Sequence, residues 1–188
     1  EHFEPKPGQV LIKLDPGMSF GTGQHATTKS CLASIDRFIS ELRGKGQKEI
    51  AMLDAGSGSG ILAIAARKLG CTRVDAFDID PDTVGVAREN AQKNGIADQE
   101  LSIAAASLME YESDTRYDIV AANILSSALL AGKEKLLSFC KPGTRLILAG
   151  ILDAEYFKVK EAFEATGHCT ELYNVLEKEW RGGAYLVK

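Results

Sequence analysis

The chain has 188 residues, of which 45% are hydrophobic and 26% are charged. This length supports one substantial hydrophobic core, so we expect a single domain over residues 1–188, with an N-terminal lid loop and helix (1–46) followed by a sheet core (47–188). The formal net charge of −4 argues against a phosphate-tracking surface, because nonspecific nucleic-acid binding depends on clustered lysine and arginine. A nucleic acid is therefore disfavoured as the direct substrate, and a basic protein partner suits the charge better.

The N-terminal residues and the cysteines indicate in which cellular compartment the protein is located. The N-terminus shows no charged-then-apolar signal pattern and the longest apolar runs have only the length of strands, so we expect no membrane association and a cytoplasmic location. The cysteines lie far apart, with neither a CxxC pair nor partners at metal-ligand spacing, at Cys31, Cys71, Cys140 and Cys169. We expect free thiols in a reducing compartment and no metal site.

The first part of the chain combines a short strand pattern, a polar loop and a helix pattern. Val10–Leu14 is predicted to form a strand that ends in the turn Asp15-Pro16-Gly17. A loop rich in glycine and hydroxyl residues follows over 19–28. Apolar residues then recur at steps of three and four between Thr27 and Leu42, which predicts a helix with one buried face.

From residue 50 onward, strand and helix patterns alternate. The alternating strands are predicted at Ile50–Asp54, Arg73–Asp78, Leu101–Ala105, Tyr117–Ala122 and Thr144–Gly150. The helices are predicted at Gly60–Leu69, Pro81–Lys93, Ser126–Cys140 and Asp153–Ala165. Short apolar strands that alternate with helices are typical of a mainly parallel sheet covered on both faces.

The last two predicted strands, His168–Leu176 and Trp180–Val187, follow each other with no helix between them. Two consecutive strands pair in antiparallel fashion, so the sheet should finish in a hairpin along one edge. The sequence therefore predicts an α/β fold: a doubly wound, mostly parallel, seven-stranded sheet with an antiparallel C-terminal edge hairpin. This Rossmann-like arrangement separates methyltransferase sheets from most dinucleotide-binding sheets.

A glycine-rich turn is the strongest local signal for a ligand. The first strand of the alternating series runs into Asp54-Ala55-Gly56-Ser57-Gly58-Ser59-Gly60 and then into a helix. Glycines at alternate positions let the turn tighten and let a ligand approach the main chain. Asp78, at the end of the next strand, can accept hydrogen bonds from both hydroxyls of a ribose. Asp80 precedes Pro81 and occupies the position of a helix N-cap.

This turn admits three interpretations: a structural connection, a dinucleotide site and an S-adenosylmethionine site. A glycine-rich turn by itself is often only a tight strand-to-helix connection. A nicotinamide dinucleotide would favour G-x-G-x-x-G around its pyrophosphate. This turn instead has G-x-G-x-G preceded by Asp54, a carboxylate that repels a pyrophosphate but attracts a sulfonium and an α-ammonium. The pattern therefore favours S-adenosylmethionine as the cofactor.

The end of the fourth strand of this series suggests the methyl acceptor. Asn123 follows an apolar strand where the methyl group should emerge, and its amide oxygen and the main-chain carbonyl beside it, toward Ile124, can accept hydrogen bonds from an amine. Deprotonating a lysine amine at neutral pH costs about 4.6 kcal/mol, which desolvation beside a cationic cofactor would lower without a dedicated base. The alternative for Asn123 is a turn residue or a helix N-cap.

Four blocks of this sequence resemble the methyltransferases of large-subunit ribosomal protein eleven, within the class I S-adenosylmethionine-dependent superfamily. The blocks are Asp15-Pro16-Gly17-Met18-Ser19-Phe20-Gly21-Thr22-Gly23-Gln24-His25-Ala26-Thr27-Thr28, then Leu53-Asp54-Ala55-Gly56-Ser57-Gly58-Ser59-Gly60-Ile61-Leu62-Ala63-Ile64, then Asp78-Ile79-Asp80-Pro81 and Ala122-Asn123-Ile124-Leu125. The first block is the specific one, since many methyltransferases share the glycine turn. The similarity covers nearly the whole chain.

The resemblance implies methylation of protein amino groups, chiefly lysine side chains of a ribosomal protein. It places Thr28, Gly56, Asp78 and Asn123 at positions that contact the cofactor. It also implies that a loop closes over the cofactor, which would bring Phe20 and Thr22 into the site. His25 would either join that site or serve as a loop or capping residue.

Two departures from the family pattern are visible. Family members usually carry an additional N-terminal domain that recognises the ribosomal protein, and this sequence begins just before the catalytic domain. The segment Ser126-Ser127-Ala128 does not match the family.

Two other functions compete with that of a protein-lysine N-methyltransferase: a nicotinamide-dependent oxidoreductase and a cofactor-binding module without catalysis.

Overall fold

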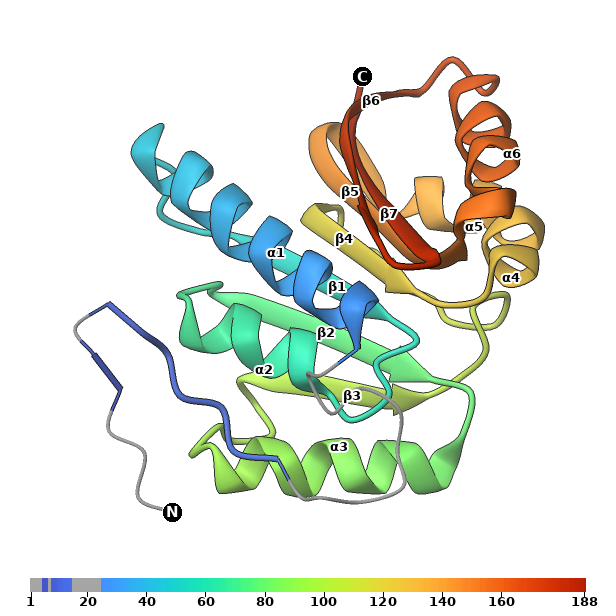
Figure 1. The fold of residues 1–188 in the computed structure, drawn as a ribbon. Helices are drawn as coiled ribbons and strands as arrows, with labels where there is room; N and C mark the ends of the chain where they lie inside the picture. The colour runs from blue at the N-terminus through green and yellow to red at the C-terminus, as the bar shows by residue number, and fades with distance from the viewer. Residues whose placement is uncertain (1–4, 7, 15–24) are drawn as a thin grey trace.

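A computed structural model describes residues 5–6, 8–14 and 25–188 (Figure 1). The strands are β1 (Ala51–Ala55), β2 (Arg73–Asp78), β3 (Leu101–Ala105), β4 (Tyr117–Asn123), β5 (Cys140–Leu152), β6 (Cys169–Glu177) and β7 (Trp180–Val187). The helices are α1 (Ala26–Gly44), α2 (Ile61–Lys68), α3 (Pro81–Lys93), α4 (Ser126–Ala131), α5 (Lys133–Ser138) and α6 (Asp153–Glu164).

The strands form one seven-stranded sheet in the order β3-β2-β1-β4-β5-β7-β6. The first five strands of that order pair in parallel, whereas β7 pairs with both β5 and β6 in antiparallel fashion. The predicted fold class is thereby confirmed, including the C-terminal hairpin. The four cysteines are free thiols, as expected.

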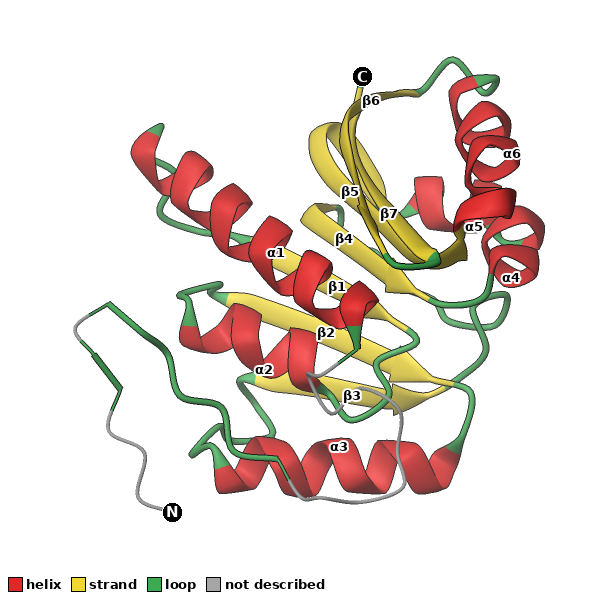
Figure 2. Cartoon of the chain, viewed as in Figure 1, coloured by secondary structure: helices red, strands yellow, loops and turns green. Residues whose placement is uncertain are grey.

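Helices cover both faces of the sheet, as Figure 2 shows. One core lies under α1, α2 and α3, and a second lies under α4, α5 and α6. Successive residues of a central strand alternate between them, so Ile119 belongs to the first core and Val120 to the second. Because both faces are buried, most residues of the central strands are apolar.

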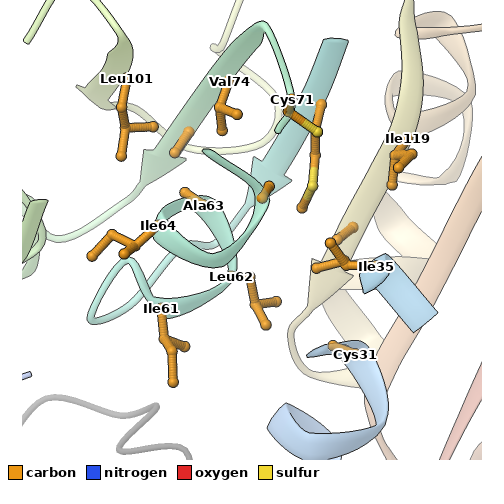
Figure 3. Packing of buried hydrophobic residues seen from close by; sticks show 14 of the residues in the cluster. Cys31, Ile35, Ile61, Leu62, Ala63, Ile64, Cys71, Val74, Leu101 and Ile119 are labelled. Atoms are coloured by element: carbon orange, nitrogen blue, oxygen red, sulfur yellow. The ribbon is translucent and has the colours of Figure 1, made fainter. Parts of the chain in front are cut away.

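Small and branched apolar side chains pack the first core. Figure 3 shows Ile61, Leu62 and Ile64 of α2 among residues from the neighbouring strands, with Cys31 and Ile35 of α1 beside them. Each of these five side chains is less than 9% exposed. This packing fixes α2 rigidly against the sheet, and α2 follows directly from the glycine-rich turn.

The prediction of a strand at Val10–Leu14 is wrong. The segment has no strand pairing, and the main-chain groups of Lys13 are used by the side chain of Asn94. The Lys13 N–H donates to Asn94 Oδ1 at 2.9 Å, and Asn94 Nδ2 donates to the Lys13 carbonyl at 2.6 Å. Because a side chain takes these backbone groups, no neighbouring strand is needed to satisfy them.

The prediction of one helix over Ser126–Cys140 is also wrong, since α4 and α5 are separate and Cys140 begins β5. Gly132 is the C-cap of α4 and the N-cap of α5. A Cβ on Gly132 would lie 2.1 Å from Cδ2 of Leu108, so a side chain at this position would require Leu108 to move. The strand predicted at Thr144–Gly150 is correspondingly longer at both ends.

Candidate functional site

The glycine-rich turn lies at the carboxyl edge of the sheet, the edge where β1, β2, β4 and β5 end. The N–H groups of Gly56 and Ser57 both donate to the Phe77 carbonyl at 2.9 Å, which ties the turn to β2. Gly56 has a φ of +78°, and a Cβ there would lie 2.3 Å from Cγ2 of Ile124. Gly56 is therefore required both by its backbone conformation and by a close contact with the end of β4. Gly58 and Gly60 follow with φ of 52° and 79°.

Asp78 connects the end of β2 to this turn. Its Oδ2 accepts the Gly58 N–H at 2.9 Å, and its Oδ1 accepts the Asp80 N–H at 3.1 Å. The side chain is half-buried, so its oxygens keep lone pairs for further donors. Asp80 accepts the Asp82 N–H at 2.9 Å and caps α3, which confirms its predicted role as a helix N-cap.

Asp54 is fully buried beneath the turn. Its Oδ2 accepts the Ala63 N–H at 3.1 Å and so caps the first turn of α2, because the N-cap residue Gly60 has no side chain to do so. Burial raises the pKa of Asp54 to about 7; the Ala63 hydrogen bond lowers it, and the charge of Asp78 raises it further. Among the described residues, its Oδ1 has no hydrogen-bond partner.

These features fit a cationic ligand that carries a ribose. Asp78, together with Asp54 when it is ionised, makes the site negatively charged, and neither forms an ion pair with any residue that the structure describes. A cation bound at the turn would offset this charge. Ser57 Oγ is likewise buried without a hydrogen-bond partner in the described part of the chain, which adds a polar atom for a ligand to satisfy.

Asn123 and Ile124 lie at the end of β4, held against β5. Asn123 pairs with Ala149, and the next residue of β5, Gly150, has a φ of +79°. A Cβ on Gly150 would lie 2.7 Å from the Ile124 carbonyl oxygen and 3.1 Å from Asn123 Oδ1. Gly150 therefore permits the close approach of both predicted acceptor-side oxygens. Sequence reasoning missed Gly150, although a glycine late in an apolar strand is a signal for such an approach.

The start of α1 supplies two more of the predicted positions. Thr28 is buried in the first turn of this helix. His25 is the N-cap residue, but its side chain makes no capping hydrogen bond; Nδ1 lies 2.8 Å from Thr27 Oγ1. Its ring also contacts Trp180 edge-on, with 5.1 Å between centroids, a contact that sequence reasoning missed. The predicted site residues Phe20 and Thr22 lie outside the described residues.

Within residues 5–6, 8–14 and 25–188, no group of three His, Cys, Asp or Glu side chains could hold a metal ion. No helix in the described part of the chain is long and apolar enough to cross a membrane. Two surface hollows, both lined by Lys141 and Pro142, lie where β5 begins and therefore away from the carboxyl edge.

The strand order and the glycine-rich turn with its two acids define a class I methyltransferase fold. Residues 1–182 match the family described as "Ribosomal protein L11 methyltransferase (PrmA)". The chain belongs to the ribosomal protein L11 methyltransferase family.

Individual relatives agree with this assignment. The chain is 43% identical over 166 residues to the ribosomal protein L11 methyltransferase of Chromohalobacter salexigens, covering 88% of this chain and 52% of that protein. It is 42% identical over 180 residues to that of Geobacter metallireducens, covering 96% and 56%. The chain thus spans about half the length of these curated relatives.

Solved structures support the same fold. The ribosomal protein L11 methylase of Lactobacillus delbrueckii subsp. bulgaricus superposes with a TM-score of 0.86 at 33% identity, covering 100% of this chain and 91% of that one. The N-methyltransferase NodS of Bradyrhizobium japonicum shares only the fold, with a TM-score of 0.64 at 14% identity over 88% of this chain and 98% of that one. Neither likeness supports the alternative of a nicotinamide-dependent oxidoreductase.

Proposed function

We propose that this chain carries the methyl-transfer site of a protein N-methyltransferase that uses S-adenosylmethionine and acts on amino groups, chiefly lysine, of a ribosomal protein. The observation that carries the proposal is the contact of Ile124 with both Gly56 and Gly150, which joins the glycine-rich turn to the end of β4. The names of the relatives supply the acceptor, ribosomal protein L11.

The residues of the turn would hold the cofactor. Asp78 would accept hydrogen bonds from the ribose hydroxyls, and the Gly56–Gly60 backbone would lie against the ligand. Asp54 would act mainly by fixing the start of α2 and by adding negative charge near a cation. Thr28, Phe20 and Thr22 would complete the cofactor site. When bound, S-adenosylmethionine supplies an electrophilic methyl group on a sulfonium.

The acceptor amine would bind at the end of β4. Asn123 Oδ1 and the Ile124 carbonyl can each accept a hydrogen bond from it, and their approach to Gly150 fixes their positions. The amine must lose a proton before it can attack, and burial of an ammonium group lowers its pKa. Asn123 would then orient the nitrogen lone pair, so that catalysis rests on alignment and exclusion of water.

A methyl-transfer assay tests this proposal. The protein is incubated with methyl-labelled S-adenosylmethionine and purified, unmethylated ribosomal protein L11, and the labelled residues are located by mass spectrometry. We expect label on amino groups of the ribosomal protein, and none with a Gly56→Val variant whose side chain would overlap Ile124. Label on RNA alone, or stabilisation by a nicotinamide dinucleotide and not by S-adenosylmethionine, would contradict the proposal.

A further inference from the structure

The end of the sheet beside Asn123 carries a group of side chains that the proposed chemistry does not use. Trp180 is the first residue of β7 and pairs with Leu152 of β5 on one side and Glu177 of β6 on the other. Residues directly opposite each other in paired strands point to the same face of a sheet. Leu152, Glu177 and Trp180 therefore share one face at the carboxyl edge.

This face opens next to the proposed acceptor position. The Trp180 ring contacts His25, three residues before Thr28. Leu152 lies two residues beyond Gly150, which contacts the Ile124 carbonyl. The face is therefore flanked by the start of α1 on one side and by the end of β4 on the other. In Figure 2 the green turn between β6 and β7 lies toward this edge of the sheet.

The same region has an excess of negative charge. Glu177 and Glu179 flank the exposed Lys178 in the hairpin turn. Glu155, which accepts a hydrogen bond from Ser126 Oγ at 2.5 Å, lies on α6, which covers the other face of the sheet. None of these three glutamates forms an ion pair with a residue of the described ranges. Asp153, by contrast, is neutralised by Arg181 at 2.6 Å. At the hairpin turn itself, two carboxylates therefore flank one ammonium.

Apolar area and backbone strain accompany the charge. Leu152 is 40% exposed and Trp180 is half-buried, so both offer apolar surface to a partner. Lys178 has a φ of +57°. Every other residue with a positive φ in the described part of the chain is a glycine. A two-residue hairpin turn favours glycine at that first position, so a lysine there is strained. Such strain concentrates at functional surfaces.

We propose that Leu152, Glu177, Glu179 and Trp180, here called the acceptor-side surface, bind a basic polypeptide segment that adjoins the amine to be methylated. The inference rests on the proposed function. The glutamates would attract the segment's lysine and arginine side chains, and the Trp180 ring would receive a cation on its face. Leu152 would contact the aliphatic part of a long basic side chain. The same carboxylates would repel a nucleic-acid strand.

Tryptophan fluorescence tests this surface without any turnover. Trp180 is the only tryptophan in the chain, so its emission reports on the surface directly. The protein is titrated with a lysine-rich decapeptide that lacks aromatic residues, with a glutamate-rich decapeptide, and with a single-stranded oligonucleotide of equal length. We expect a saturable change in emission with the lysine-rich peptide only.

Charge reversal supplies the specific variant and its matched control. In Glu177→Lys/Glu179→Lys we expect the lysine-rich peptide to bind roughly tenfold more weakly and the KM for ribosomal protein L11 to rise by a similar factor, with unchanged kcat and cofactor Kd. The control Glu49→Lys/Glu89→Lys reverses two exposed carboxylates that lie elsewhere, before β1 and on α3, and should behave as the parent does. Circular dichroism confirms that both variants are folded.

The outcomes separate this inference from the proposed function. An emission change with the oligonucleotide instead of the basic peptide would overturn it, as would equal binding by the two double variants. If the parent protein binds the basic peptide through this surface but transfers no methyl group to ribosomal protein L11, the surface stands and the proposed function fails. If transfer occurs with the same KM in both double variants, the proposed function stands and the surface fails.

Discussion

The two halves of the carboxyl edge are built in different ways. In the cofactor half, at the ends of β1 and β2, main-chain N–H groups, glycines and the carboxylates of Asp54 and Asp78 define the geometry, as in the Gly58 to Asp78 hydrogen bond of 2.9 Å. In the acceptor half, from β4 to the β6–β7 hairpin, exposed side chains such as Leu125, at 69% exposure, dominate. The first half constrains most of its residues by backbone conformation, whereas the second, apart from Gly150 and Lys178, leaves its side chains free to match a partner.

The largest effect should come from Gly56→Ala, at the boundary of the two halves. The added Cβ would overlap Ile124, so the turn must move, and we expect cofactor affinity to fall by more than about 100-fold. Gly46→Ala is the matched control, since its φ is +84° with no atom within 4 Å of the new Cβ. Calorimetric titration measures the affinity. Equal cofactor binding by both variants would show that the contact is unimportant.

Asn123→Ala should distinguish the two halves by their effects on kcat and on cofactor Kd. The side chain lies in the acceptor half, and its loss should reduce kcat by about 100-fold through misalignment of the amine, with little change in cofactor Kd. Ser126→Ala, nearby on α4 and bonded to Glu155, serves as the control and should keep kcat. Equal losses in kcat and cofactor affinity for Asn123→Ala would move this residue to the cofactor half.

Asp78→Ala should act on the cofactor half alone. Loss of charged hydrogen bonds to the ribose and to the Gly58 N–H should weaken cofactor binding by about 1.5 to 3 kcal/mol. Asp80→Ala, at the neighbouring N-cap of α3, should instead lower the free energy of unfolding with nearly unchanged affinity. Cofactor titration and urea unfolding of both variants check the contrast, and unchanged affinity in Asp78→Ala would assign the ribose to another residue.

Asp54→Asn should have the smallest effect, visible as a change in pH dependence. Because burial raises the pKa of Asp54 to about 7 from 3.8, its protonation stabilises the folded state fully below the unfolded pKa, and this contribution is lost as pH rises toward 7. The Tm of the ligand-free parent, relative to Asp54→Asn, should therefore fall by a few degrees between pH 4 and pH 8. Asp98→Asn, at an exposed carboxylate, is the control; a parallel pH profile for Asp54→Asn would refute the assignment.

Features with strong local sequence signals, in the strands, the helices and the cofactor half, are those that the sequence predicts correctly. The bounds of β2, β3, β7 and α3 were predicted correctly, because apolar strands and an aspartate-proline helix start have strong local signals. The glycine turn and Asp78 were predicted to lie together, and the Gly58 to Asp78 hydrogen bond brings them together. Their roles toward a ligand remain predictions.

Long-range contacts explain what was missed. Val10–Leu14 resembles a strand, but its backbone is satisfied by Asn94, which is far away in the sequence. Gly132, between α4 and α5, packs closely against Leu108, a contact that periodicity cannot indicate. Gly150 and Trp180 gained importance only through their partners in other elements, Ile124 and His25. Pairings of this kind are set by tertiary packing and not by local pattern.

The position of Ile124 between Gly56 and Gly150 has a consequence for how the domain can diversify. The Cγ2 atom of Ile124 fills the space beside Gly56, and the main-chain carbonyl of Ile124 fills the space beside Gly150, so a side chain added at either glycine would have to displace residue 124. The β6–β7 hairpin lies outside this contact, so its length and its charged residues can change without disturbing Ile124. A new protein target could therefore be acquired by remodelling the hairpin alone, while the reaction centre stays as it is.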